Sequence, residues 1–185
     1  MIFVIWAIIF VLGIWVISTY NGLTALRLRI QNAWRQIDVQ LKRRYDLIPN
    51  VVETVKGYMQ YEQDTLQKVI DARSQAMASK GVKETAEAQN ALTQSLGKVF
   101  VLMENYPELK ASKNVLDLQE ELTTTENQIA FARQYYNDLV TQYNTKQQVF
   151  PSNMIAGLFG FHPSEFFEVV EAEKALPRVN LSLTR

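Results

Sequence analysis

The chain opens with an uninterrupted apolar run in which every position from Met1 to Ile17 is apolar and the first basic residue is Arg27. The next three residues extend the run to about twenty, and a helix of that length is about 30 Å long, the thickness of a hydrocarbon core. A cleaved signal peptide needs a basic start, a shorter apolar stretch and a small-x-small cleavage site. The run has no such start and is too long. We therefore expect an uncleaved transmembrane anchor over residues 1–22.

The apolar pattern continues beyond the anchor at spacings of three and four residues, which predicts that the membrane helix runs on into the first helix of a domain. These positions are Leu23, Leu26, Ile30, Trp34, Ile37, Leu41, Tyr45 and Ile48. The same phase continues at Val52, Val55, Met59, Leu66 and Val69 or Ile70, up to a stop signal at Ser79-Lys80-Gly81. At Pro49 we favour a kink in this helix over a break. In the alternative, Asp46 is the N-cap of a new helix and Pro49 lies in its first turn.

Two more helices follow, the first of them a weaker amphipathic helix from about Lys83 to Met103 that ends at Asn105-Tyr106-Pro107. Its apolar side comprises Ala86, Leu92, Leu96, Val99, Phe100 and Met103. The second is longer, because apolar or small residues alternate at spacings of three and four over about five heptads. They are Val115, Leu118, Leu122, Thr125, Ile129, Ala132, Tyr136, Leu139, Tyr143, Lys146 and Phe150, and Pro151 closes the run. Strand signals are nearly absent, so we predict an all-α fold, an elongated antiparallel helical bundle on a single anchor.

The segment from Phe150 to Val170 is dense in aromatic residues and is interrupted by Gly and Pro, so it is too short to span a membrane. We favour a loop and short helix folded back over the bundle. The alternative is an interaction surface for another subunit. Both interpretations use Phe159, Phe161, Phe166 and Phe167. The predicted domains are the anchor at 1–22, the bundle at 23–176 and an extended or flexible tail at 177–185.

Charge and composition exclude some classes of partner and indicate on which side of the membrane the domain lies. The 185 residues carry no net charge, so the chain lacks the broad basic surface that nucleic-acid binding needs. With no Cys and one His, disulfides and the usual zinc sites cannot form within one chain. Arg27, Arg29 and Arg35 follow the anchor, which predicts that the C-terminal bulk is cytoplasmic. Arg27 and Arg29 are candidate contacts to lipid headgroups.

The remaining polar residues are candidates for a site, and each also has a structural explanation. Asp38 with Arg35, Arg43 and Arg44, and likewise Arg73 and Arg133, could build a site, but we favour ion pairs across helices. His162 is expected to be exposed or locally hydrogen-bonded. Thr123-Thr124-Thr125 has no adjacent base to activate a hydroxyl. We therefore assign no catalytic, cofactor-binding or metal-binding residue and expect no cofactor.

Short motifs along the chain stand in a characteristic order. The first half carries Tyr20-Asn21 with Leu23, Ala33-Trp34, Gln36 to Arg44, Asp46 to Asn50, Val55 to Tyr58, and Ala72-Arg73. The second half carries Tyr106 to Ala111, Glu121-Leu122 with Thr125-Glu126, Ile129-Ala130, Ala132-Arg133, Tyr136-Asn137, Tyr143-Asn144, Phe150-Pro151, Gly160-Phe161 and Phe166 to Glu168. In these motifs the chain resembles the LemA family. It departs from the family at Tyr61-Glu62, where His commonly precedes Glu, so Glu62 is interpreted as a structural polar group.

The resemblance implies a single-pass bacterial inner-membrane protein with a cytoplasmic helical bundle and no established catalytic activity. In that family, neighbouring genes often encode membrane-bound zinc metalloproteases, which suggests a part in membrane-protein quality control. We expect a non-enzymatic scaffold or adaptor that forms a homo-oligomer in the lipid bilayer and serves quality control or envelope organisation, with a membrane-bound protease among its partners. The alternatives are a lipid-binding envelope protein, or a metal-dependent hydrolase that uses Glu121, Glu126 and Asp38 with a recruited metal.

Overall fold

The computed structural model describes residues 1–59 and 61–168, and these residues fold into helices without a strand. The helices are α1 (Ile2–Lys56), α2 (Gln63–Ala78), α3 (Gly81–Met103), α4 (Pro107–Ala111), α5 (Lys113–Gln148) and α6 (Ser152–Leu158). The predicted all-α fold is therefore confirmed. The expected tail at 177–185 and the predicted end of the bundle at residue 176 lie outside the described residues.

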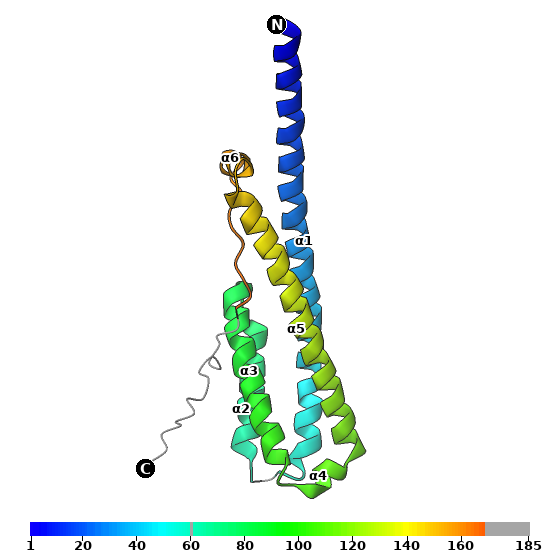
Figure 1. Cartoon of the computed structure of the whole chain (residues 1–185). Coiled ribbons are helices and arrows are strands. Elements are labelled where there is room, and N and C mark those ends of the chain that lie inside the picture. The colour runs from blue at the N-terminus through cyan, green and yellow to red at the C-terminus, as the bar shows by residue number, and fades with distance from the viewer. Residues whose placement is uncertain (60, 169–185) are drawn as a thin grey trace, which may run out of the picture.

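Four of the helices form an elongated antiparallel bundle (Figure 1). The chain descends in α1, returns in α2, descends again in α3 and returns in α5, with the short α4 at the turn between the last two. The most extensive packing joins α1 to α5, and α2 and α3 form the second pair. The short α6 lies at the end of α5 and contacts both α5 and α1.

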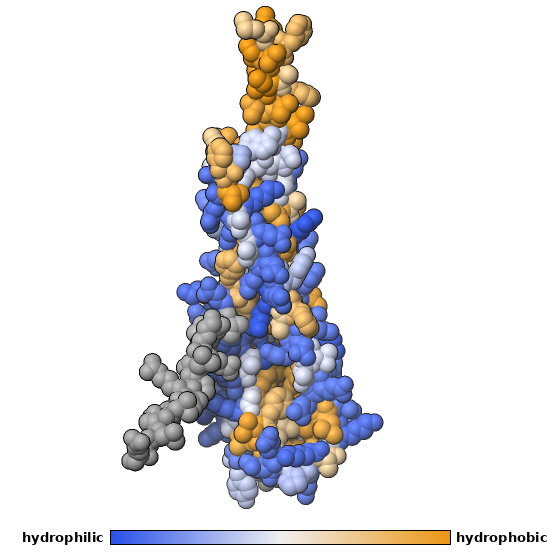
Figure 2. Space-filling view, in the orientation of Figure 1, coloured by the Kyte–Doolittle hydropathy of each residue, from blue (hydrophilic) through white to orange (hydrophobic). Residues whose placement is uncertain are grey.

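The N-terminal part of α1 projects beyond the bundle, where Figure 2 shows a continuous hydrophobic surface. Every side chain from Met1 to Ile14 is exposed. Within the described part of the chain, α1 alone is long and apolar enough to cross a membrane. The predicted continuity between the apolar segment and the first bundle helix is confirmed, because α1 is a single helix of 55 residues.

The stripes predicted from the apolar spacing form the core. All eight positions predicted for the first helix are buried or half-buried, and so are the six on the apolar side of α3. On α5 the prediction holds from Val115 to Lys146. It fails at Phe150, which is exposed because α5 ends at Gln148 and the chain turns there. The short α4 was not predicted.

The prediction of one helix up to Ser79 was wrong. The first helix ends at Lys56, and α2 starts at Gln63 and returns beside it. The apolar spacing concealed this turn because Met59, in the connection, is fully buried and keeps the phase of the stripe. A packed loop residue can occupy a helical register position without being helical.

The helix passes through Pro49 without ending, so the alternative with a new helix at Asp46 is also wrong. Proline has no backbone N–H, so the carbonyl of Tyr45, four residues earlier, loses its helical partner. Arg73 on α2 replaces that partner, since its Nε donates to the Tyr45 carbonyl oxygen at 2.7 Å. The bundle thus accommodates the proline by a side-chain hydrogen bond from the neighbouring helix.

Candidate functional site

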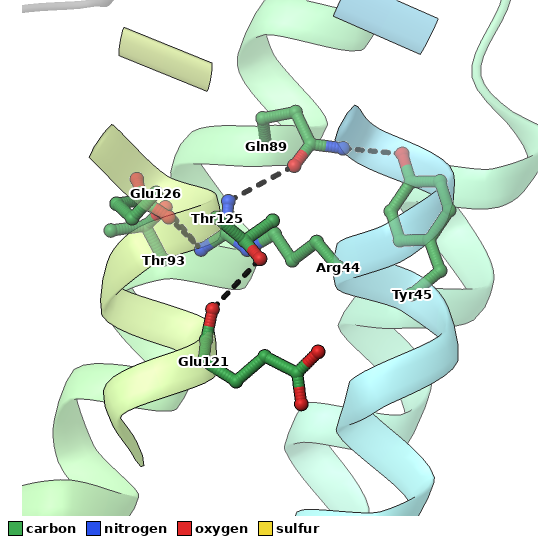
Figure 3. A network of polar contacts seen from close by, with 7 residues as sticks. All are labelled: Arg44, Tyr45, Gln89, Thr93, Glu121, Thr125 and Glu126. Atoms are coloured by element: carbon green, nitrogen blue, oxygen red, sulfur yellow. Dashed lines mark hydrogen bonds and ion pairs between the residues drawn. The ribbon is translucent and has the colours of Figure 1, made fainter. Parts of the chain in front are cut away.

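A network of polar side chains joins the bundle helices at the level of Arg44 (Figure 3). The Arg44 side chain is 3% exposed and reaches from α1 between α3 and α5. Its Nη1 donates to Gln89 Oε1 at 3.1 Å, and its Nη2 donates to Thr93 Oγ1 at 2.7 Å. The same Nη2 forms an ion pair with Glu126 Oε2 at 3.0 Å. One guanidinium therefore connects three helices.

The network continues through Gln89 to the fourth helix of the bundle. Gln89 Nε2 donates to the Tyr45 hydroxyl, which in turn donates to the carbonyl oxygen of Ala76 on α2 at 3.1 Å. Burial lowers the pKa of Arg44, while the Glu126 carboxylate opposes that shift, and the guanidinium remains charged. Burial raises the pKa of the Tyr45 hydroxyl, which stays protonated at neutral pH. These groups are therefore held in fixed protonation states.

A hollow of about 230 Å³ opens beside Arg44 and Glu126. Its remaining wall is mostly apolar and comprises Leu96, Phe100 and Leu122, with Thr93, Gly97, Thr123 and Asn127. The charged groups at its edge already bond to each other, and Thr93 accepts from Arg44. This arrangement stabilises the junction of the helices, and it offers no free base beside a nucleophile of the kind that acid–base chemistry requires.

A second polar arrangement holds the segment after α6 along α5. Asn137 Nδ2 donates to the Phe167 carbonyl at 3.1 Å, and the Phe167 N–H donates to Asn137 Oδ1 at 2.9 Å. Asn144 makes the same pair of bonds with Ser164, both at 2.9 Å. The two asparagines lie two turns apart on one face of α5, so their amides pair with the extended backbone much as a neighbouring strand would.

These asparagine hydrogen bonds position the aromatic side chains of the segment after α6 against the bundle. Phe167 is 2% exposed, and its ring lies against Trp34, with a centroid separation of 5.9 Å, and beneath the Arg133 guanidinium. Phe161 is half-buried against Tyr20. Both rings therefore pack within their own chain. Phe159 and Phe166 remain exposed.

Removing the asparagine amides should release this segment locally. In the Asn137→Ala variant, the Phe167 amide is expected to exchange with solvent about 10-fold to 100-fold faster, because two hydrogen bonds worth about 1 kcal/mol each are lost. Hydrogen exchange followed by mass spectrometry or NMR measures this. In the control Asn153→Ala, which changes an exposed residue on α6, the Phe167 amide should keep its rate. Unchanged exchange in both variants would contradict the clamping role of Asn137.

A third feature is an exposed apolar face between α1 and α5, formed by Val39, Phe131 and Tyr135, which we call the α1–α5 face. All three side chains are at least half exposed, and Phe131 is 72% exposed. They border a shallow hollow of about 480 Å³ together with Gln36, Gln40, Gln128 and Ala132. The Gln40 Oε1 atom is buried there and has no hydrogen-bond partner among the described residues.

The other candidate site residues from the sequence analysis do not gather in one site. Arg43 pairs with Glu121 at 3.0 Å on the surface, so both carboxylates of α5 named for the hydrolase alternative are in ion pairs with arginines. Burial raises the pKa of Asp38. Arg27, Arg29 and His162 are exposed. Among residues 1–59 and 61–168, no group of three or more His, Cys, Asp or Glu side chains could hold a metal ion.

Sequence reasoning missed several residues that the structure brings together. Gln89 and Thr93 were not singled out, although their positions four residues apart on α3 place them on one face. Asn137 and Asn144 appeared only as the second residues of the dipeptides Tyr136-Asn137 and Tyr143-Asn144. The available signal was polar residues at helical spacing beside an apolar stripe, and such a signal does not name the partner that each residue will find.

Comparisons with known proteins identify a family and several relatives. The model of the LemA family matches residues 33–181. Protein LemA of Metamycoplasma hominis is 29% identical over 147 residues, covering 78% of this chain and 67% of that protein. The magnetosome proteins MamQ 1 and MamQ 2 of Paramagnetospirillum magneticum are each 22% identical over 175 residues, covering 80% of this chain and 64% of theirs. The MamQ alignments thus span less than two thirds of those proteins. Since the family match extends over most of the sequence, from the middle of α1 to beyond the segment that Asn137 and Asn144 hold, the chain belongs to the LemA family.

Proposed function

We propose that this protein is a non-enzymatic scaffold, anchored in the bacterial inner membrane by α1, which associates with further copies of itself through the α1–α5 face. The observation that carries the proposal is the cluster of exposed Val39, Phe131 and Tyr135 beside a buried Gln40 oxygen that has no hydrogen-bond partner within residues 1–59 and 61–168. Exposed contiguous apolar surface is typical of interfaces, and aromatic residues are enriched at their centres. A facing helix would cover the apolar side chains and could supply a donor to Gln40.

A non-enzymatic role is supported by how the conspicuous polar groups are used. Arg44, Gln89 and Tyr45 are bonded to one another and to neighbouring helices. Glu121 and Glu126, the carboxylates of the hydrolase alternative, are engaged with arginines. The network holds the helices in register, and its groups resemble those of a buried structural network more than a site prepared for a substrate.

Membrane-protein quality control, with a membrane-bound protease as partner, is the process that the family resemblance implies; envelope organisation is the alternative. An assembly of anchored bundles would present several copies of the same surface to such a partner. Repeated weak contacts then add to an avidity that a single copy lacks.

The bundle is expected to lie in the cytoplasm, because basic residues follow the anchor from Arg27 onward. A phosphatase reporter that folds only outside the cytoplasm, fused after Arg185, should be inactive. A reporter that works only in the cytoplasm should be active at the same position. The opposite pattern would overturn the proposed orientation.

Self-association through the α1–α5 face is tested by cysteine crosslinking in native membranes. The chain contains no Cys, so a single introduced thiol reports one position. We expect Phe131→Cys to form a disulfide-linked dimer on mild oxidation. Val101→Cys on α3 is a matched control, since Val101 is 66% exposed against 72% for Phe131 and lies outside the face. Equal yields at the two positions, or no dimer at either, would refute an interface at this face.

A further inference from the structure

The corner between α5 and α6 exposes large apolar side chains that the described residues of the chain cover only in part. They are Phe150, Met154, Leu158 and Phe159, which we call the α6 patch. Met154 is 64% exposed and Leu158 is 76% exposed, and their spacing of four residues puts them on one side of the short helix. The opposite side of α6, with Ile155 and Ala156, is buried against the bundle.

Contacts with α1 place this patch at a defined height along the anchor. The rings of Phe159 and Phe161 lie against Tyr20, with centroid separations of 4.9 and 5.6 Å. Thr19 is buried, whereas every residue of α1 from Ile2 to Ile14 is exposed. The contacts between α6 and α1 therefore begin just after the exposed apolar part of α1, which ends near Ile14. Figure 2 shows the corresponding hydrophobic surface beside the base of that bare segment.

The level of Tyr20 along α1 corresponds to the boundary between lipid and water. From Ile2 to Tyr20 the helix rises about 27 Å, close to the thickness of a hydrocarbon core of about 30 Å. The first charged residue, Arg27, lies about 10 Å further along the axis, near the outer edge of a headgroup region that is about 5 to 8 Å deep on each side. A helix packed at Tyr20 therefore lies where the anchor leaves the hydrocarbon.

Basic groups border the patch on the side toward the bundle. Lys146, on the last turn of α5, lies so close to Gly22 that a Cβ atom there would overlap its Nζ. Arg27 lies on α1 about two turns beyond Tyr20, toward the bundle. Apolar side chains next to lysine and arginine are the composition of helices that lie in the plane of a membrane interface and meet anionic headgroups.

The shape of the turn after α6 keeps the patch oriented. Gly160 has φ +68°, the left-handed conformation that suits glycine. The Phe161 N–H donates to the Ala156 carbonyl at 2.9 Å, which closes the C-terminus of α6 in a Schellman arrangement. This closure directs Phe161 to Tyr20 while Leu158 and Met154 face outward. The chain then returns along α5, where Asn144 and Asn137 hold it.

We propose that the α6 patch inserts into the lipid boundary of the leaflet from which α1 emerges, so that the bundle meets the membrane at two points. The occupant is the bilayer, because the patch continues the apolar surface of the anchor and basic groups border it where headgroups would lie. A second contact point would restrict tilting and rotation of the bundle about α1 and so orient the α1–α5 face relative to the membrane plane.

Depth-dependent quenching in vesicles tests this proposal with the full chain. Leu158→Cys is labelled with an environment-sensitive fluorophore, and the protein is reconstituted at about one chain per vesicle in phosphatidylcholine and phosphatidylglycerol. Part of the lipid carries a nitroxide near the top of the acyl chain. The control is Leu116→Cys, an exposed leucine near the start of α5, about 45 Å from Lys146 along the helix.

The expected result is severalfold stronger quenching at position 158 than at 116, with Met154→Cys behaving like position 158. Equal, weak quenching at all three positions would overturn the proposal. It would equally be overturned if the label at 158 enters an apolar environment only at high protein density and without quenching by the lipid nitroxide, because a protein partner would then cover the patch. Circular dichroism confirms that each labelled variant retains its helix content.

Discussion

Replacing Ile129 by Asp is expected to lower the free energy of unfolding of the bundle by about 4 kcal/mol or more, because an unpaired carboxylate would be placed in the core. Ile129 is 1% exposed and lies near the middle of α5, where that helix packs on α1. Denaturant unfolding in detergent, followed by helical circular dichroism, measures the change.

The control is Gln134→Asp on the same helix, since Gln134 is exposed and does not line the hollow of the α1–α5 face. It should change the free energy of unfolding by less than about 0.5 kcal/mol. Two variants of equal stability would mean that the assigned core face of α5 is wrong.

The second large effect is expected at Arg44. Arg44→Ala removes the guanidinium that joins Gln89, Thr93 and Glu126, leaves the buried Gln89 oxygen without a partner and opens a cavity. We expect a loss of about 2 to 4 kcal/mol, discounted from the value for a fully buried pair because Glu126 keeps partial access to water.

Arg43 provides the matched comparison, because it is the adjacent residue and its ion pair with Glu121 is exposed. Arg43→Ala should cost less than about 1 kcal/mol. Arg44→Lys should recover only part of the loss, since an ammonium group cannot reproduce the planar fork that donates to separate acceptors. Comparable stability of Arg43→Ala and Arg44→Ala would contradict the central position of Arg44 in the network.

Helix identity was predictable because each bundle helix buries one stripe, and burial imposes the spacing of three and four residues on the sequence. The stripes at Leu23 to Ile48 and at Val115 to Lys146 therefore predicted α1 and α5 well. The turn after Lys56 was missed for the same reason, because Met59 is buried and continues the stripe through a loop. Periodicity reports burial and cannot by itself distinguish a helix from a packed connection.

For the polar contacts, the sequence predicted the type of interaction but not the partner residues. Structural pairing of the arginines was expected, and Arg43, Arg44 and Arg73 do bond to other helices. Their partners depend on which helices become neighbours and at which height, and that follows from the α1–α2 turn that the pattern concealed. The asparagine clamp involves the backbone of Ser164 and Phe167, for which side-chain identity carries no signal.

The central claim, a membrane-anchored scaffold that assembles through the α1–α5 face, is tested most directly by counting subunits in the membrane. Single fluorescently tagged particles, held in native membrane patches at low density, should bleach in more than one step. The double variant Val39→Ser with Phe131→Ser should shift them to single steps while retaining its helix content and its membrane location. Single-step bleaching of the unaltered protein at all densities would contradict the account, as would multi-step bleaching that the double variant leaves unchanged.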